Sequence, residues 1–317
     1  MDFTQNISDA KLFSAKDLVV VLTGGGSGIG AAFASALAQS SARKVYILGR
    51  RLPSLQATAS TINALPGLAG PDPVVVPVQC DVTDRESAAA AAQRVHDDAG
   101  GYADVLINNA GVTGPKHTAV YGAQSLADVQ VILQSNADGW PATFATNTAA
   151  VVGVAAAFLP LLDAANRRRG WEPGKLEPGA KPRGRGLPRA EGVEDADVRT
   201  SQIITVASIA AFNRYVTAGL AYSSSKAGAV HIGKTLATML APWGIRSNVL
   251  CPGIFPSQMT EGAPTEFPAD KIPSGRQGSF EDLAAYLLYL VGKGGSYVNG
   301  SVQLVDGGRL SMHPATY

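Results

Sequence analysis

Short apolar runs alternate with helix-like segments along the whole chain. The first run, Leu18–Thr23, is rich in valine and is closed by glycines. The other runs share its continuous apolar character; they are Lys44–Leu48, Val74–Val78, Asp104–Asn108, Gln202–Ala207, Ser247–Cys251 and Val302–Val305. Strands that are apolar throughout, rather than alternating with polar residues, are typical of a parallel sheet covered on both faces.

Segments with a helical pattern separate these strands. They are Gly28–Gln39, Pro53–Ala64, Asp84–Ala99, Pro141–Ala164, Leu220–Leu240 and Glu281–Val291. Because alternating strands and helices imply right-handed crossovers, the pattern predicts an α/β fold with a doubly wound parallel sheet of seven strands. We expect residues 1–317 to form one domain.

Two segments interrupt this rhythm. Residues 166–200 are rich in proline and glycine and contain the run Arg167-Arg168-Arg169. Such a stretch buries too little apolar area to offset its ordering entropy, which predicts a surface insertion that is at least partly mobile. A basic patch for an acidic partner is the alternative, and the acidic residues interspersed in the segment argue against it. Residues 254–280 have little periodicity and are predicted to form a lid over bound ligands.

Composition narrows the function classes. Apolar residues make up 46% of the chain and the net charge is +1, which indicates a compact globular protein and gives no sign of a nucleic-acid or membrane partner. The longest apolar stretch, Ala149–Leu162, is too short for a bilayer and contains Pro160. Cys80 and Cys251 are the two cysteines, and no secretory signal opens the sequence. We therefore expect a cytoplasmic protein without disulfides or a metal site.

A glycine-rich loop, Thr23-Gly24-Gly25-Gly26-Ser27-Gly28-Ile29-Gly30, follows the first strand and opens a helix. Glycines let the backbone approach a pyrophosphate, and the helix N-terminus supplies free N–H groups and a favourable dipole. Such a loop is weak evidence by itself, because a tight turn without a ligand would have the same sequence. Its position predicts a Rossmann-like dinucleotide-binding domain.

The end of the second strand selects the dinucleotide. An acidic residue there would bind the ribose 2′-hydroxyl of NAD and repel the 2′-phosphate of NADP. The chain instead has Gly49, Arg50 and Arg51. Two guanidinium groups suit a phosphate dianion, so NADP(H) is the predicted cofactor. Ordinary solvated surface charges are the alternative.

Tyr222 and Lys226 are four residues apart in a helical segment and therefore project from one face. A free phenol titrates near pH ~10. A neighbouring ammonium group and an oxidised nicotinamide would both lower that pKa. Tyr222 is thus predicted to give its proton to a developing alkoxide in reduction and to act as base in oxidation. The spacing alone also arises by chance in structural helices.

These motifs, together with Asn108-Asn109-Ala110-Gly111 after the fourth strand, resemble the short-chain dehydrogenase/reductases of the short single-domain type. The likeness extends over nearly the whole chain. It implies that the cofactor is held by Thr23, Gly24, Ser27, Gly28, Ile29, Gly30, Arg50, Arg51, Asp81, Val82, Asn109, Ala110, Gly111, Tyr222, Lys226, Pro252, Gly253, Phe255 and Ser257. Ser257 stands where threonine is usual and keeps the hydroxyl group.

The same resemblance implies four catalytic residues. Ser208, fourteen residues before Tyr222, would hydrogen-bond the substrate carbonyl, and Lys226 would also bind the nicotinamide ribose. Asn147, inside the long helix, would hold a water that connects Lys226 to solvent; a polar filler is its alternative role. The segment Cys251–Ser257 is similar to a subset often described as carrier-protein reductases.

The predicted activity is that of an NADPH-dependent carbonyl reductase or alcohol dehydrogenase. The aromatic and aliphatic residues in 209–221 and 254–279 favour a largely apolar ketone or secondary alcohol. A 3-oxoacyl thioester reductase is the first alternative, and a catalytically silent NADP-binding scaffold or sensor is the second. The two long helices, Pro141–Ala164 and Leu220–Leu240, are expected to pair chains into a homodimer or homotetramer.

Overall fold

A computed structural model describes residues 8, 12–135 and 137–316. Its strands are β1 (Val19–Thr23), β2 (Lys44–Gly49), β3 (Val75–Gln79), β4 (Val105–Asn108), β5 (Gln202–Val206), β6 (Arg246–Pro252) and β7 (Val302–Val305). They form one parallel sheet in the order β3-β2-β1-β4-β5-β6-β7. The predicted fold class is confirmed, and each strand end lies within one residue of the expected position.

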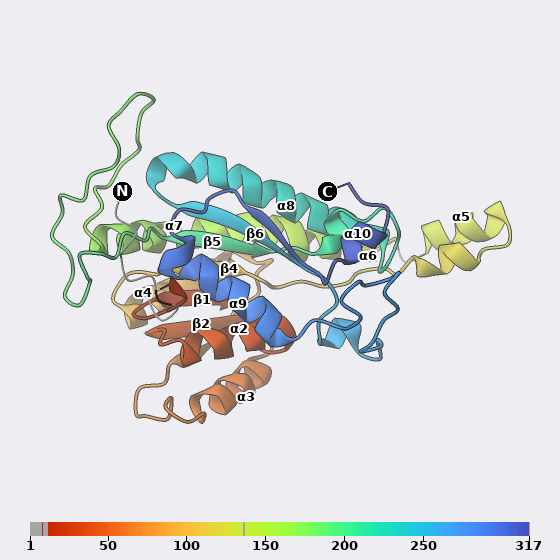
Figure 1. Cartoon of the computed structure of the whole chain (residues 1–317), viewed down its shortest axis with the longest axis horizontal. Helices are drawn as coiled ribbons and strands as arrows, with labels where there is room; N and C mark the ends of the chain where they lie inside the picture. The colour runs from red at the N-terminus through yellow and green to blue at the C-terminus, as the bar shows by residue number, and fades with distance from the viewer. Residues whose placement is uncertain (1–7, 9–11, 136, 317) are drawn as a thin grey trace.

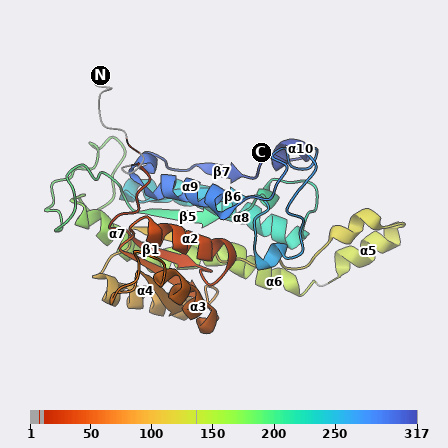
Figure 2. The ribbon, with the colours of Figure 1, turned by 60° about the horizontal axis from the view of Figure 1, so that its bottom comes forward.

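Helices cover both faces of this sheet (Figures 1 and 2). They are α2 (Gly28–Gln39), α3 (Leu52–Asn63), α4 (Arg85–Ala99), α5 (Leu126–Gln134), α6 (Gly139–Phe144), α7 (Ala150–Arg168), α8 (Leu220–Leu240), α9 (Phe280–Val291) and α10 (Arg309–Met312). The side chains of β1 alternate between two apolar cores. Val20 and Leu22 pack with residues of α2, α3 and α9, whereas Val19 and Val21 pack with residues of α4, α7 and α8.

The strand order places the ligand crevice. β1 pairs with β2 on one side and with β4 on the other. The chain direction of the crossovers therefore reverses beside β1, and a crevice opens beyond the carboxyl ends of β1 and β4. Residues that follow these strands in the sequence meet at this edge of the sheet.

The long central helix extends further than predicted and is not regular. It runs from Gly139 to Arg168, and the π-helical turn Ala145–Ala149 separates α6 from α7. By length and composition alone this helix could cross a membrane. Phe158 and Leu162 of α7 are, however, fully buried in the core that α7 shares with α4. Such burial is typical of a core helix in a folded α/β domain.

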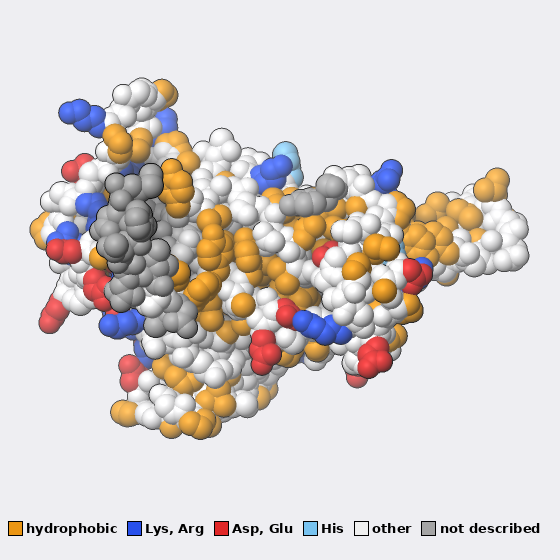
Figure 3. All heavy atoms as spheres, in the orientation of Figure 1, with side chains coloured by type: hydrophobic (Ala, Val, Ile, Leu, Met, Phe, Trp, Pro, Cys, Tyr) orange, Lys and Arg blue, Asp and Glu red, His pale blue; other side chains and the backbone are white. Residues whose placement is uncertain are grey.

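Helix α5 was missed by the sequence analysis. Ser125 and Asp128 form a capping box at its start. This Ser-x-x-Asp signal, followed by Val129, Val131, Ile132 and Leu133, could have identified the helix. The helix projects from the body in both views (Figures 1 and 2). Its residues Leu126 and Val131 are exposed, and hydrophobic side chains line the arm in Figure 3.

The segment between α7 and β5 has no regular helix or strand within 169–201, a range that the structure describes completely. Its basic residues serve separate structural contacts. The Arg185 guanidinium lies over the ring of Trp171, 5.2 Å from the centroid. Arg169 is 2% exposed and pairs with the buried carboxylates of Asp104 and Asp197. The segment is thus attached to the amino-terminal edge of the sheet (Figure 1).

Candidate active site

The glycine loop forms a cradle that side chains would block. Gly24 has φ +70°, and a Cβ atom there would lie 2.9 Å from Cα of Ala110. A Cβ at Gly30 would lie 2.2 Å from the carbonyl oxygen of Gly24. Within the described part of the chain, the Ser27 side chain does not cap the first N–H groups of α2. These donors and the open cradle therefore fit a pyrophosphate.

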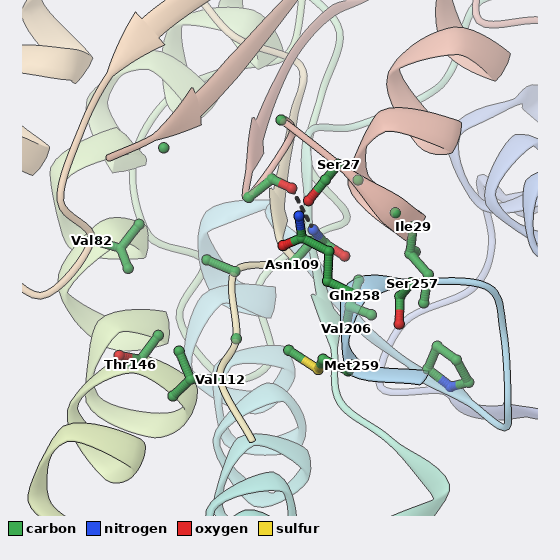
Figure 4. A pocket seen from close by; sticks show the side chains of 18 of the residues that line it. Ser27, Ile29, Val82, Asn109, Val112, Thr146, Val206, Ser257, Gln258 and Met259 are labelled. Carbon is green, nitrogen blue, oxygen red and sulfur yellow. Dashed lines mark hydrogen bonds between the residues drawn. The ribbon is translucent and has the colours of Figure 1, made fainter. Parts of the chain in front are cut away.

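Thr23 and Asn109 fasten the loops after β1 and β4 together. The Thr23 hydroxyl oxygen accepts hydrogen bonds from the backbone N–H groups of Asn109 (3.0 Å) and Ala110 (3.1 Å). The Asn109 amide nitrogen donates to the carbonyl oxygens of Thr23 (3.0 Å) and Gly24 (3.3 Å). Asn109 lies centrally in Figure 4. The two side chains hold the crevice in shape, a contribution that the sequence analysis did not separate from ligand contact.

One pocket of about 330 Å³ collects the predicted site. Every predicted site residue except Thr23 and Asn147, which lie behind its wall, lines it. The lining residues that the sequence did not assign to the site are Gly26, Gly49, Ser54, Leu55, Cys80, Val112, Thr146, Val206 and Ala207. Gln258, Met259 and Thr260 also line the pocket and belong to the predicted lid 254–280. Most of the unassigned residues adjoin predicted ones, so an extension of each motif by one or two positions would have found them. Figure 4 shows Val112 and Thr146 across the pocket from Ser27 and Ile29 of the glycine loop.

Arg50 and Arg51 lie exposed at the mouth of the pocket, directly after β2. A guanidinium nitrogen of Arg51 is 3.4 Å from the side-chain oxygen of Gln258. The nearby Asp81 carboxylate accepts hydrogen bonds from the backbone (2.9 Å) and hydroxyl (2.7 Å) of Thr83. These bonds, with a smaller contribution from Arg50, hold the pKa of Asp81 below its usual range. This edge of the pocket therefore carries two cations beside one stabilised carboxylate.

Ser208, Tyr222 and Lys226 meet on the pocket wall. A hydrogen bond joins the side chains of Ser208 and Tyr222. The Lys226 ammonium donates to the carbonyl oxygen of Val206 at 2.9 Å and lies 6.0 Å from the centre of the Tyr222 ring. Lys226 is 4% exposed, and burial lowers its pKa to about 8.

The expected acidification of Tyr222 by the protein is wrong. Burial raises the pKa of the phenol, and the hydrogen bond with Ser208 opposes this rise only in part. Lys226, whose ammonium donates to the Val206 carbonyl and lies 6.0 Å from the centre of the ring, does not offset the burial. The protein's own groups thus keep Tyr222 protonated at neutral pH, and a bound cation would have to supply any acidification.

Asn147 links three segments at the π-helical turn. Its amide nitrogen donates to the Val112 carbonyl (2.9 Å) and to the Ser225 hydroxyl (3.0 Å), and its amide oxygen accepts from the Val112 N–H (2.9 Å). A Cβ atom at Gly111 would lie 3.2 Å from this oxygen and 3.3 Å from the Lys226 nitrogen. Glycine at that position leaves space beside both polar groups. The Asn147 side chain is therefore largely engaged by protein, and its predicted water link to Lys226 stays a prediction.

The described residues contain no group of three or more His, Cys, Asp or Glu side chains arranged to bind a metal ion. Cys80 and Cys251 are free and buried. Burial raises the pKa of the Cys251 thiol to about 12, so it is neutral at physiological pH.

The pocket defines the class of the protein, a dinucleotide-binding enzyme whose proton-transfer groups share one cavity with the phosphate loop. Residues 18–170 match the family model described as short chain dehydrogenase, and residues 190–309 match that described as Enoyl-(Acyl carrier protein) reductase. The chain is 34% identical to the short-chain dehydrogenase/reductase PhomF of Diaporthe leptostromiformis, over 99% of this chain and 98% of that protein. It is 36% identical to the short-chain dehydrogenase/reductase VdtF of Byssochlamys spectabilis, over 98% of each.

Solved structures agree with these relatives. The Pseudomonas aeruginosa RhlG/NADP active-site complex superposes with a TM-score of 0.71 at 25% identity, over 94% of this chain and 98% of that one. The chain belongs to the short-chain dehydrogenase/reductase family. It is accordingly an oxidoreductase that acts on CH–OH or C=O groups of small molecules with a nicotinamide cofactor.

Proposed function

We propose that the chain is an NADPH-dependent carbonyl reductase that interconverts a largely apolar ketone and its secondary alcohol. One observation carries the proposal: Ser208, Tyr222 and Lys226 open onto the same pocket as the glycine cradle. A ligand seated on the cradle and a carbonyl group at Tyr222 would therefore be neighbours.

The basic edge supports NADP(H) over NAD(H). Arg50 and Arg51 follow β2, where a carboxylate would be needed to select the 2′-hydroxyl. RhlG, whose structure is similar, was solved as an NADP complex. The cradle, the uncapped start of α2 and these guanidinium groups fit the phosphates of such a cofactor.

The protein groups divide the chemistry between them. Bound nicotinamide would supply the hydride for reduction. The Ser208 hydroxyl would orient the substrate carbonyl, and Tyr222 would transfer its phenolic proton to the oxygen that becomes the alcohol. Because burial raises the pKa of Tyr222, the phenol carries this proton at neutral pH. Reduction uses this protonated form, whereas oxidation needs the phenolate as base, so the rate of oxidation should rise with pH.

The substrate side of the pocket is apolar. Val112, Val206 and Met259 line it, together with Phe255, a buried residue at the start of the segment 254–280. This segment begins at β6 and is fastened at its far end by a hydrogen bond from Gly278 N–H to the Ile254 carbonyl (3.0 Å). We infer that it closes over bound ligands as a lid. Apolar walls favour a ketone without charged groups.

A 3-oxoacyl thioester reductase is the second candidate. It is favoured by the 28–29% identity of the chain to two bacterial proteins named 3-oxoacyl-[acyl-carrier-protein] reductase. Oxidation of NADPH in the presence of a 3-oxoacyl thioester, compared with a panel of uncharged ketones, separates the two. Lack of turnover with either class would instead favour an NADP-binding scaffold.

Assembly and location are part of the proposal. The helices α7 and α8 expose Val152 and Met239, and Trp243 is exposed just beyond α8. We infer that these surfaces pair chains into a homodimer or homotetramer in the cytoplasm. Light scattering on the purified protein measures the mass directly, and a monomer at micromolar concentration would contradict the pairing.

Tyr222→Phe tests the central claim. Loss of general acid catalysis should lower turnover by roughly 10²- to 10⁴-fold. NADPH binding, followed by fluorescence titration, should change less than about 2-fold, because the ring remains in place. Tyr297→Phe, at a fully exposed tyrosine that does not line the pocket, is the matched control. Turnover of Tyr222→Phe near that of the control would overturn the proton-donor role.

A further inference from the structure

Helix α8, which carries Tyr222, cannot provide its own N-terminal cap. Its N-cap residue is Gly219, which has no side chain. A Cβ atom at Gly219 would lie 1.8 Å from the carbonyl oxygen of Pro115, so a serine or aspartate cannot replace it without displacing the backbone. The first N–H groups of a helix nevertheless need acceptors.

His117 supplies the missing acceptor from another segment. Its Nδ1 atom accepts a hydrogen bond from the backbone N–H of Leu220, the first residue of α8, at 3.3 Å. The His117 backbone N–H donates to the Ala218 carbonyl at 3.2 Å and fixes the approach of the ring. An imidazole nitrogen accepts only when it carries no proton, so this bond requires the tautomer protonated at Nε2.

Burial makes the choice of histidine informative. His117 is 1% exposed, and its ring packs edge-on against Trp140 with 6.3 Å between ring centres. Among the residues that the structure describes, its Nε2 atom has no hydrogen-bond partner. An apolar side chain would fill this site without burying an unpaired N–H group. The cost of burying this unpaired N–H group is explained if the other ring nitrogen, Nδ1, is needed as an acceptor at the N-terminus of α8.

We propose that His117 is a positioning residue for Tyr222. The proposal rests on the proposed function, in which Tyr222 transfers the proton. Leu220 and Tyr222 lie in the same first turn of α8, so an uncapped start would let this turn fray and would blur the position of the phenol relative to Ser208. Lys226 lies one turn further along and is held by its bond to Val206.

Three substitutions at position 117 separate capping from packing. His117→Asn places an amide oxygen near the position of Nδ1, whereas His117→Gln places its amide near Nε2. His117→Leu fills the site without an acceptor. We expect Leu and Gln to lower kcat by roughly 3- to 30-fold, the range set by the loss of a helix cap, with the NADPH KM unchanged within about 2-fold. His117→Asn should retain most of the wild-type kcat.

Hydrogen exchange provides a readout that does not depend on activity. Amides in 213–224 should exchange faster in the Leu and Gln variants than in wild type, and the Asn variant should resemble wild type. Wild-type exchange in both Leu and Gln variants would overturn the capping role. Faster exchange with unchanged kcat, in a protein that Tyr222→Phe inactivates, would overturn the positioning role. If Tyr222→Phe stays active, the proposed function fails instead. The exchange data would still show whether His117 caps α8. Should the Leu variant not fold, the Asn and Gln pair makes the same comparison.

Discussion

Arg50→Ala is the sharpest test of cofactor choice that the pocket offers. The side chain is exposed at the pocket mouth, and the local backbone is held independently of it, because the Gln79 amide donates to the carbonyl oxygen of Arg50 at 3.1 Å. Alanine should therefore remove a cation and leave the end of β2 in place. NADPH should lose a partner for its 2′-phosphate, and NADH should lose nothing.

The expected magnitude follows from exposure. A hydrogen bond to a charged group contributes about 1.5–3 kcal/mol. Screening by water at an exposed site places Arg50 at the low end of this range, which corresponds to roughly a 10-fold increase in the NADPH KM. The double variant Arg50→Ala/Arg51→Ala should approach roughly 100-fold if the two guanidinium groups act independently. The NADH KM should stay within about 2-fold in both.

The assay is the initial rate of cofactor oxidation with one ketone, measured against NADPH and NADH at low and high salt. Arg94→Ala is the matched control, since Arg94 is exposed on α4 and does not line the pocket. The preference of the wild type for NADPH should narrow as salt rises, because exposed charges are screened. Equal changes in the two Michaelis constants of Arg50→Ala would refute the reasoning.

Three further predictions concern buried charges. Arg169→Met should lower the unfolding free energy by about 3–5 kcal/mol, because it leaves the buried carboxylates of Asp104 and Asp197 without their cation. Arg167→Met, at an exposed position, should cost less than about 1 kcal/mol. Equal midpoints of urea unfolding for the two variants would contradict this prediction. Hydrogen bonds and ion pairs with Arg199 and Arg169 hold the pKa of Asp197 well below its usual range. The difference in unfolding free energy between wild type and Asp197→Asn should therefore be largest above pH ~4 and decrease as the pH falls below that value. A difference that stays constant down to pH ~2 would contradict this pH dependence. Burial lowers the pKa of Lys226 to about 8. Lys226→Met should therefore lose turnover yet gain up to roughly 3 kcal/mol of stability at pH 7, and this advantage should fade between pH ~8 and ~10. A Met variant that is less stable than wild type at pH 7 would show that burying the ammonium group carries no such cost.

The sequence was sufficient for the sheet and for most of the pocket, for a physical reason. Strands buried on both faces are apolar throughout, so their limits are visible in composition alone. Motifs such as Thr23–Gly30 follow these strands directly, and parallel strands bring their carboxyl ends to one edge. Residues far apart in the chain, such as Arg50 and Tyr222, could therefore be assigned to one site before any coordinates.

What the sequence analysis missed depends on tertiary contacts. The rise in the pKa of Tyr222 comes from burial, and the amount of burial is set by segments that pack around α8. The π-helical turn at Asn147 has no signature in a helix-forming stretch. Arg167 and Arg169 are alike in sequence, yet one lies at the surface and the other pairs with two buried carboxylates. Residue identity alone therefore could not show which of these arginines is buried.

The attachment of residues 169–201 has a practical consequence. One carboxylate oxygen of Asp104 accepts a hydrogen bond from the Val19 N–H at 2.7 Å, and the other pairs with Arg169. The start of the segment is therefore bound to the sheet. Ala180 and Lys181 of this segment are exposed. The segment 169–201 lies at the end of the sheet opposite the carboxyl ends of the strands, where the pocket opens (Figure 1). A fluorophore or affinity tag placed there would leave the pocket accessible in assays on the immobilised enzyme or on single molecules.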